Sequence, residues 1–310
     1  MTKPKPAKKP KAKPTSSTGK PTTSAAKLSW LPKKTFTLEF SIPWSKVKVS
    51  YDKVLTQLAK QVKLEGFRQG KAPKDMVEKA TDKAKLYGEV INQLLPLSYA
   101  QAVKQHHLKP ATAPKIQIIK AEENQAWQFQ ATSCELPEVK LGDYKTIAKG
   151  ALAKEKIWTP DKGKPEENQA KQLTDTQKFN LIAQALLKDI KLELPDLLVE
   201  TERDKMLAKL LDQVQKLGLT IEQYAASSQK TVDQLKTDYH QTASNTLKIE
   251  LILQAIANDR QVKVDEKEID KMIAAAGDDK LKKQLNTPAE RAYIASILKK
   301  RQIIDYLISL

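Results

Sequence analysis

The sequence has few of the residues that usually build reactive sites. Its single cysteine, Cys134, cannot form an internal disulfide, which fits the reducing cytoplasm in which we expect the protein. Cys134 lies in a strand pattern, which favours a buried small hydrophobe over a nucleophile. The three histidines, His106, His107 and His240, have neither metal-ligand spacing nor a cysteine cluster to join. We therefore expect no metal, no cofactor and no catalytic residue.

Long apolar runs and aromatic side chains are scarce as well. No run approaches the ~18–20 apolar residues of a membrane span, and the N-terminal stretch lacks the apolar segment of a secretory signal. The 310 residues are 40% hydrophobic, 29% charged and only 5% aromatic. The first two values are ordinary for a globular protein, and the length allows about two domains. We expect no membrane partner and no export.

Acidic residues are missing from the start of the chain. The formal net charge is +17, and ten lysines precede Glu39, the first acidic residue. Residues 1–29 consist almost wholly of Lys, Pro, Ala, Ser and Thr, a composition that cannot bury enough apolar surface to fold. We expect a disordered tail over residues 1–34. A flexible polycation attracts nucleic acid, so one open alternative is a basic RNA-binding protein that acts through the lysine tail.

Sequence patterns predict an α+β domain over residues 35–145. Residues 35–42 alternate apolar and polar side chains, as a half-buried strand does. Ser45 is a candidate helix N-cap before a helical pattern, and a second helical pattern begins at Pro73. Further strands are predicted at residues 115–119, 127–131 and 134–141. An order of strand, helices and strands is typical of an α+β domain.

The rest of the chain is predicted to be helical. Periodicity lapses over residues 146–172, where Pro and Gly indicate a linker. Residues 173–310 carry only helical patterns, from which we expect five or six helices. Gly218 is expected just after a helix, and capping residues are predicted at Thr231, Asp265 and Thr287. Two helices longer than ~20 residues favour an elongated all-α domain with helical arms.

The motif Gly66-Phe67-Arg68-Gln69-Gly70-Lys71-Ala72-Pro73 is the most informative feature of the chain. Its glycines and proline favour a compact turn that displays one aromatic ring and two cations. Such a tip suits an anionic, partly apolar surface, because Arg and Lys bind phosphates and carboxylates. The motif fails as a phosphate-binding P-loop, since Ala72 stands where Ser or Thr would bind Mg²⁺. An ordinary basic helix–helix connection is the simpler alternative.

This motif resembles the ribosome-binding signature of trigger factor, a family of bacterial ATP-independent chaperones that meet nascent chains at the ribosomal exit tunnel. Other parts of the family's N- and C-terminal domains resemble the segments Leu94–Pro96, Leu108–Pro110, Leu136–Tyr144 and Leu194–Glu200. The resemblance covers most of residues 35–310. It implies a chaperone that docks at the ribosome and shields nascent or unfolded polypeptides, with a homodimer as one of its states.

The resemblance also assigns roles within the loop. Phe67 and Arg68 would contact ribosomal protein and rRNA, and Lys71 would add phosphate affinity. Gln69 departs from the family pattern, which usually has a cation there, so docking should be weaker. We expect the lysine tail to offset that lost charge. The residues that would shape the loop are Gly66, Gly70 and Pro73.

The family usually carries an FKBP-like peptidyl-prolyl isomerase domain between its two other parts. Residues 146–172 are fewer than the ~50 residues of the smallest ordinary domain and include one aromatic residue, Trp158. We therefore expect that the isomerase is absent and that the protein is not an enzyme. A peptidyl-prolyl isomerase of the trigger factor family remains an alternative function, which turnover of a proline peptide would reveal.

Overall fold

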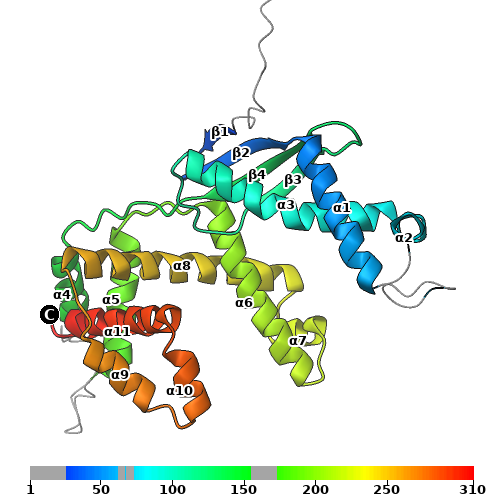
Figure 1. Ribbon diagram of the computed structural model, residues 1–310. Coiled ribbons are helices and arrows are strands. Elements are labelled where there is room, and N and C mark those ends of the chain that lie inside the picture. Colours follow the sequence, from blue (N-terminus) through cyan, green and yellow to red (C-terminus); the bar gives the residue numbers. More distant parts are fainter. Residues whose placement is uncertain (1–25, 62–66, 68–72, 155–172) are drawn as a thin grey trace, which may run out of the picture. The chain divides into compact units, whose positions relative to one another are not determined.

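The computed structural model describes residues 26–61, 67, 73–154 and 173–310. These residues form two units, which are described separately below (Figure 1). The sheet unit contains residues 37–108 and 115–132 together with residues 26–29, where described. The helical unit contains residues 30–36, 109–114 and 133–310, where described.

A four-stranded sheet has the strand order β1-β2-β4-β3. The strands are β1 (Lys27–Leu31), β2 (Thr35–Ile42), β3 (Lys115–Lys120) and β4 (Trp127–Cys134). Every second residue of β2 is buried, because successive side chains of a strand point to opposite faces. β3 pairs with β4 in antiparallel fashion, from Lys115 opposite Thr132 to Lys120 opposite Gln128. The sheet therefore has one apolar face, as the alternation in residues 35–42 predicts.

Two helices, α1 (Trp44–Gln61) and α3 (Lys83–Gln105), cover that apolar face (Figure 1). The short α2 (Lys74–Ala80) lies away from the sheet and packs against α1. Trp127 of β4 is 1% exposed and lies at the centre of an aromatic cluster. Its ring lies 5.5 Å from that of Tyr87 on α3 and 6.3 Å from that of Trp44 on α1, measured between centroids. Its indole N–H donates to the carbonyl of Glu122 at 3.1 Å, so the buried polar atom is satisfied.

The helical unit is built from eight described helices. These are α4 (Tyr144–Lys154), α5 (Asp175–Asp189), α6 (Asp196–Lys216), α7 (Ile221–Ser227), α8 (Val232–Asp259), α9 (Glu266–Ala274), α10 (Asp279–Leu285) and α11 (Pro288–Ile308). Its main core joins α4, α5, α8 and α11. Fully buried residues of this core include Ala148, Ile182, Leu186, Ile252, Ile256 and Leu307.

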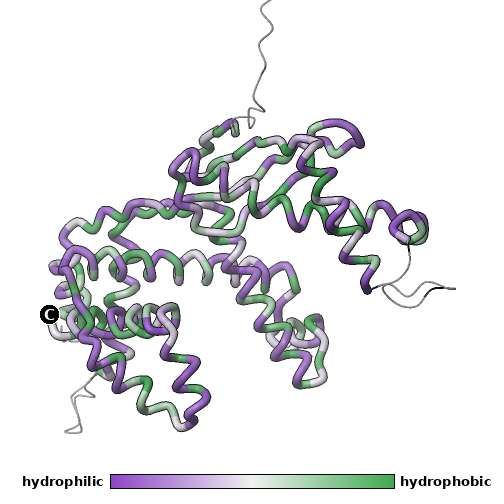
Figure 2. Tube along the Cα trace, in the orientation of Figure 1, coloured by the Kyte–Doolittle hydropathy of each residue, from purple (hydrophilic) through white to green (hydrophobic). Residues whose placement is uncertain are grey.

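Two arms extend from this core, and each has a small core of its own. The first arm consists of α6, α7 and the start of α8, which bury Leu210, Val214 and Leu235 together. The second arm consists of α9, α10 and the start of α11, which bury Ile269, Ile273 and Ile294. Apolar residues recur among polar ones along these helices (Figure 2). At helical spacing this gives each helix an apolar side to bury. The prediction of an α+β domain followed by a helical domain with arms is confirmed.

Several local signals in the helical unit are confirmed. Gly218 comes directly after Leu217, the C-cap of α6. Its φ is +73°, a left-handed conformation that glycine adopts without strain. Thr231 forms a complete capping box with Gln234 at the start of α8. Thr287 accepts a hydrogen bond from the backbone of Glu290 at the start of α11. Asp265 also caps its helix, although its side chain accepts from the backbone N–H of Lys267. These caps set where the arm helices begin.

Order begins earlier than the sequence indicates, and the predicted tail of residues 1–34 is wrong at its end. Lys27–Leu31 form β1, which pairs with β2. The ring of Trp30 lies 5.6 Å from the ring of Phe36, edge to face. A strand of five residues that follows a lysine-rich segment is too short to show a clear alternation of apolar and polar residues. Pairing with β2 orders it. Residues 1–25 lie outside the described part of the chain.

The predicted linker of residues 146–172 is wrong over its first third. Tyr144–Lys154 form α4, in which Ala148 is fully buried against α5, α8 and α11. The hydroxyl of Tyr144 donates to Asp259 at 3.2 Å, which fixes α4 to the end of α8. Residues 155–172 lie outside the described part of the chain. The helical unit therefore includes residues that the sequence assigned to the linker.

Smaller expectations also need correction. Only the first residue of the predicted strand 134–141 belongs to a strand, since Pro137 has no N–H for a ladder. Ser45 lies inside α1, and Pro73 is the N-cap of α2 rather than its first helical residue. Residues 173–310, which are all described, form seven helices instead of five or six.

Candidate binding surfaces

The predicted docking loop connects α1 to α2. Five of its candidate residues, Gly66, Arg68, Gln69, Gly70 and Lys71, lie outside the described residues. Phe67 is described, and it is 37% exposed. Pro73 is the N-cap of α2 with φ of −60° and ψ of 144°. The structure thus describes one exposed aromatic residue and the helical ends on either side of it.

The far end of the loop is attached to α1 through α2. Val77 of α2 is completely buried. The hydroxyl of Tyr51 on α1 donates to a carboxylate oxygen of Glu78 on α2 at 2.8 Å. Burial, followed by this hydrogen bond, raises the pKa of Tyr51 to about 12, so the hydroxyl keeps its proton at neutral pH. Two contacts therefore hold the short helix that follows the loop.

A second tyrosine extends this attachment to α3. The ring of Tyr87 lies 5.5 Å from that of Tyr51, and its hydroxyl donates to Glu123 in the β3–β4 connection. The hydrogen bond from Tyr87 and the charge of Lys83, whose Nζ lies 3.5 Å away, lower the pKa of Glu123. Burial and the Glu123 carboxylate raise the pKa of Tyr87. The base of the loop is thus built from α1, α2, α3 and the β3–β4 connection.

Sequence reasoning missed these anchors. Tyr51 lies on the apolar face of a predicted helix, where a core role is the default expectation. Its partner Glu78 is 27 residues further along the chain, on a different helix. Only the fold brings the two together.

The other reactive residue types have structural roles in the described part of the chain. Cys134 is fully buried, and burial raises the pKa of its thiol, so the expectation of a small core hydrophobe is confirmed. His106 is the C-cap of α3 and its Nε2 lies 2.7 Å from the carbonyl of Ala26, so it is more than a surface residue. Across the described ranges, no group of three or more His, Cys, Asp or Glu side chains could hold a metal ion. No described helix is long and apolar enough to cross a membrane.

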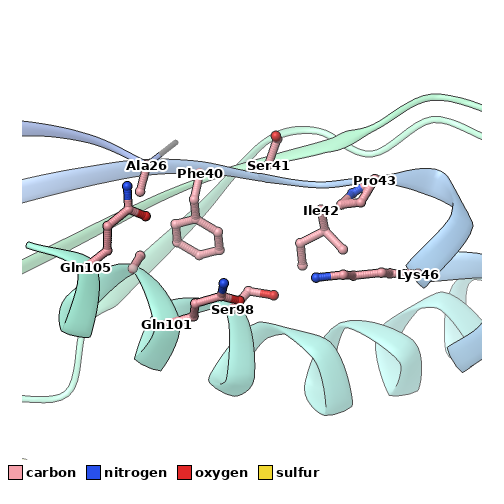
Figure 3. Close-up of a pocket in the computed structure, with 10 residues that line it drawn as sticks. Ala26, Phe40, Ser41, Ile42, Pro43, Lys46, Ser98, Gln101 and Gln105 are labelled. Atoms are coloured by element: carbon pink, nitrogen blue, oxygen red, sulfur yellow. The ribbon is translucent and has the colours of Figure 1, made fainter. Parts of the chain in front are cut away.

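A small hollow lies between β2 and α3 (Figure 3). Phe40 and Ile42 point into it from the strand, and Ser98 and Gln101 face it from the helix. Its volume is about 30 Å³. Small-molecule pockets usually measure ~300–1,000 Å³, so this hollow is a packing gap.

The helical unit exposes large apolar side chains on both arms. On the first arm these are Leu211, Leu217 and Leu219, and on the second they are Met272, Leu281, Tyr293 and Ile297. A groove of about 740 Å³ lies between α8 and α11, and its lining includes Leu253, Tyr293 and Ile297. Tyr293 is 63% exposed. Large apolar side chains that gather at one exposed site are typical of a surface that binds another molecule.

Comparison with known proteins assigns the family. A family model described as bacterial trigger factor protein (TF) matches residues 25–159. A second, described as bacterial trigger factor protein (TF) C-terminus, matches residues 163–309. The trigger factor of Streptococcus suis (strain 05ZYH33) is 35% identical over 120 residues, which are 39% of this chain and 28% of that protein. The trigger factor of Lactococcus lactis subsp. lactis (strain IL1403) is 31% identical over 163 residues, or 53% of this chain and 36% of that protein.

These alignments span about a third of the length of the relatives. A solved structure, described as showing promiscuous substrate recognition in folding and assembly activities of the trigger factor chaperone, has the same fold. Its TM-score is 0.59 at 12% sequence identity, and the match covers 92% of this chain and 99% of that one. With both family models matched in order, over residues 25–159 and 163–309, the chain belongs to the trigger factor family.

Proposed function

We propose that this protein is an ATP-independent chaperone of the cytoplasm that docks at the ribosomal exit tunnel and shields nascent or unfolded polypeptides. Docking would use the loop Gly66–Pro73. The observation that carries this proposal is the anchored base of that loop, where α2 packs against α1, buries Val77 and is joined to α1 by the Tyr51–Glu78 hydrogen bond. A fixed base lowers the entropy that the loop loses on docking, which favours binding.

Docking would combine one apolar contact with several charged ones. Phe67 is exposed and can enter an apolar site on a ribosomal protein. Arg68 and Lys71 would contact phosphates, which position a protein on RNA without reading its sequence. Gln69 supplies no charge at its position. The seven lysines of residues 1–25 would add salt-dependent attraction to rRNA.

Shielding would use the apolar surface of the helical unit. Tyr293 and Ile297 line the groove between α8 and α11, and both are exposed enough to contact a client. The first arm offers further exposed leucines, such as Leu217. Contacts that are few and separate give weak binding to many sequences. A weakly held client dissociates by itself, so the cycle requires no nucleotide hydrolysis.

The arrangement of the two family matches supports a chaperone without an isomerase domain. The first match ends at residue 159 and the second begins at residue 163. The interval between the two matches is far shorter than a domain, which is consistent with the expected short connection. We therefore propose that the protein acts by binding and not as a peptidyl-prolyl isomerase.

Co-sedimentation with vacant ribosomes tests the docking step. The variant Phe67→Ala/Arg68→Ala removes a ring and a cation from the loop. A matched control, Tyr293→Ala/Arg301→Ala, also removes one aromatic ring and one cation, but from the exposed surface of the helical unit. Central interface residues of this kind each contribute about 2 kcal/mol, so the loop variant should bind at least tenfold more weakly. The control should bind like the unmodified protein.

Two outcomes would reject the proposal. Ribosome binding that is unchanged by the loop variant would show that the loop does not dock. Binding that disappears when residues 1–25 are deleted, while the loop variant has no effect, would favour the basic RNA-binding alternative.

A further inference from the structure

The sheet unit has a second surface that neither the docking loop nor the arms include. A groove follows α1 and α3, and it consists of two hollows of about 450 and 610 Å³ that share Gln93. The hydroxyl of Ser50 donates to Gln93 Oε1 at 3.3 Å, and Gln93 Nε2 donates to Gln57 Oε1 at 3.2 Å. This chain of hydrogen bonds joins the two helices at the middle of the groove.

One end of the groove is apolar. Val49 of α1 and Leu97 of α3 line the first hollow together with Leu94. Val49 is 56% exposed and Leu97 is 70% exposed, the largest value among the large apolar residues described in the sheet unit. Contiguous aliphatic surface of this kind gains free energy when a partner covers it.

The rim of the groove is basic. Lys46, Lys53 and Lys60 line it from α1 at intervals of seven residues, which places them on one face about 10.5 Å apart. Lys85 of α3 adds a fourth ammonium group, and Glu89 is the one acidic residue in the lining of the two hollows. None of these lysines forms an ion pair with a described residue.

Some lysines elsewhere in the described chain are neutralised by a carboxylate. Lys83 pairs with Glu123, Lys230 with Asp238 and Lys300 with Glu250. In α1, four lysines accompany a single acidic residue, Asp52. The positive charge along the groove is therefore available to a partner.

We propose that the α1–α3 groove binds an acidic amphipathic polypeptide segment, with aliphatic residues at helical spacing and carboxylates beside them. The aliphatic side chains would cover Val49 and Leu97, and the carboxylates would pair with the lysine rim. An amphipathic helix in an apolar groove is a common recognition mode. This partner class is additional to the docking loop and does not depend on ribosome binding.

Other occupants fit less well. Residues 1–25 of the same chain carry seven lysines and no acidic residue, so the rim repels them. A nucleic acid would satisfy the lysines, but its phosphates would leave Val49 and Leu97 without apolar cover. The combination of an aliphatic floor and a cationic rim therefore favours a polypeptide.

Fluorescence anisotropy with the full-length chain tests this inference. The probe is a labelled peptide of about 16 residues made of Glu and Leu, with Leu at helical spacing. The groove variant is Lys53→Glu/Leu97→Ser, in which both altered residues are exposed. The matched control, Lys48→Glu/Ile118→Ser, makes the same changes on exposed residues outside the groove. All variants keep the basic tail, so its background binding cancels.

We expect the groove variant to bind the probe at least about tenfold more weakly, or ~1.4 kcal/mol, and the control to stay within about twofold. Equal weakening by the control would overturn the inference, as would no measurable binding to the unmodified chain. Equal binding of a shuffled Glu–Leu peptide, or of a Lys–Leu peptide, would also overturn it. If an RNA duplex shows the same dependence on Lys53 and Leu97, the groove is a nucleic-acid surface instead.

Discussion

Replacing two exposed residues of the second arm should reduce client protection without destabilising the protein. The variant Tyr293→Ser/Ile297→Ser removes the two large apolar side chains that α11 contributes to the groove with α8. Tyr293 is 63% exposed and Ile297 is 39% exposed. Neither belongs to the buried cluster of the arm, so the fold should persist.

The size of the effect follows from the exposed area. An aromatic side chain buries about 200 Å² when fully covered, so covering the exposed part of Tyr293 gives about 3 kcal/mol at 25 cal/mol per Å². Ile297 adds about 1 kcal/mol by the same reasoning. Binding recovers only part of such area, because ordering the client costs free energy. A loss of about 1–2 kcal/mol is expected, which is about a 5- to 30-fold weaker affinity.

The assay is suppression of aggregation while a denatured client is diluted into buffer. We expect the variant to need about 5 to 30 times more protein than the unmodified chain for half protection. The loop variant Phe67→Ala/Arg68→Ala is the matched control and should protect normally. Equal protection by the Tyr293→Ser/Ile297→Ser variant, with unchanged thermal unfolding, would refute the assignment of this groove to clients.

Three further predictions concern the anchors and the unit boundary. Tyr51→Phe removes the donor to Glu78, so the amides of α2 should exchange about fivefold faster in hydrogen-exchange mass spectrometry, and unchanged exchange would contradict the anchoring. Ala148→Asp places a carboxylate in the core that α4 shares with α5, α8 and α11, and should cost about 3 kcal/mol in denaturant unfolding. The exposed Lys149→Asp should cost less than about 0.5 kcal/mol, and equal costs would restore the linker interpretation. The pKa of Tyr51 is raised from 10.0 to about 12, so its stabilising effect is complete below pH 10 and is lost as pH rises from 10 to 12. Tyr51→Phe should therefore lose less stability than the unmodified protein over that range, and parallel losses would contradict the shift.

The sequence predicted those elements whose pattern lies within a few residues. β2 alternates over eight residues and buries every second one, so its period is visible without any partner. The starts of α8 and α11 carry Thr caps whose hydrogen-bond partners are three residues away. Such local signals identify an element before the tertiary fold is known.

Elements that depend on distant partners escaped prediction. β1 has five residues and is ordered by pairing with β2. α4 buries Ala148 against residues such as Ile252, which lies more than a hundred positions later. Its lysines and glycine, taken alone, resemble a loop.

The candidate site divides in the same way. The exposure of Phe67 agrees with the motif of eight residues that displays it, and its role in docking stays a prediction. The Tyr51–Glu78 anchor was not predicted, since it joins two helices across 27 residues. Helical spacing also cannot separate the exposed Tyr293 from a core residue, because both recur with the same period.

Site-specific cross-linking from position 67 would show whether the loop meets the ribosome beside the exit tunnel. A photoreactive phenylalanine analogue would replace Phe67 in the full chain, which is then mixed with vacant ribosomes and irradiated. We expect cross-links to protein or rRNA beside the exit tunnel, and no such cross-links from the same analogue at position 293. Cross-links from position 67 to sites away from the exit, or equal yields from both positions, would contradict docking through the loop.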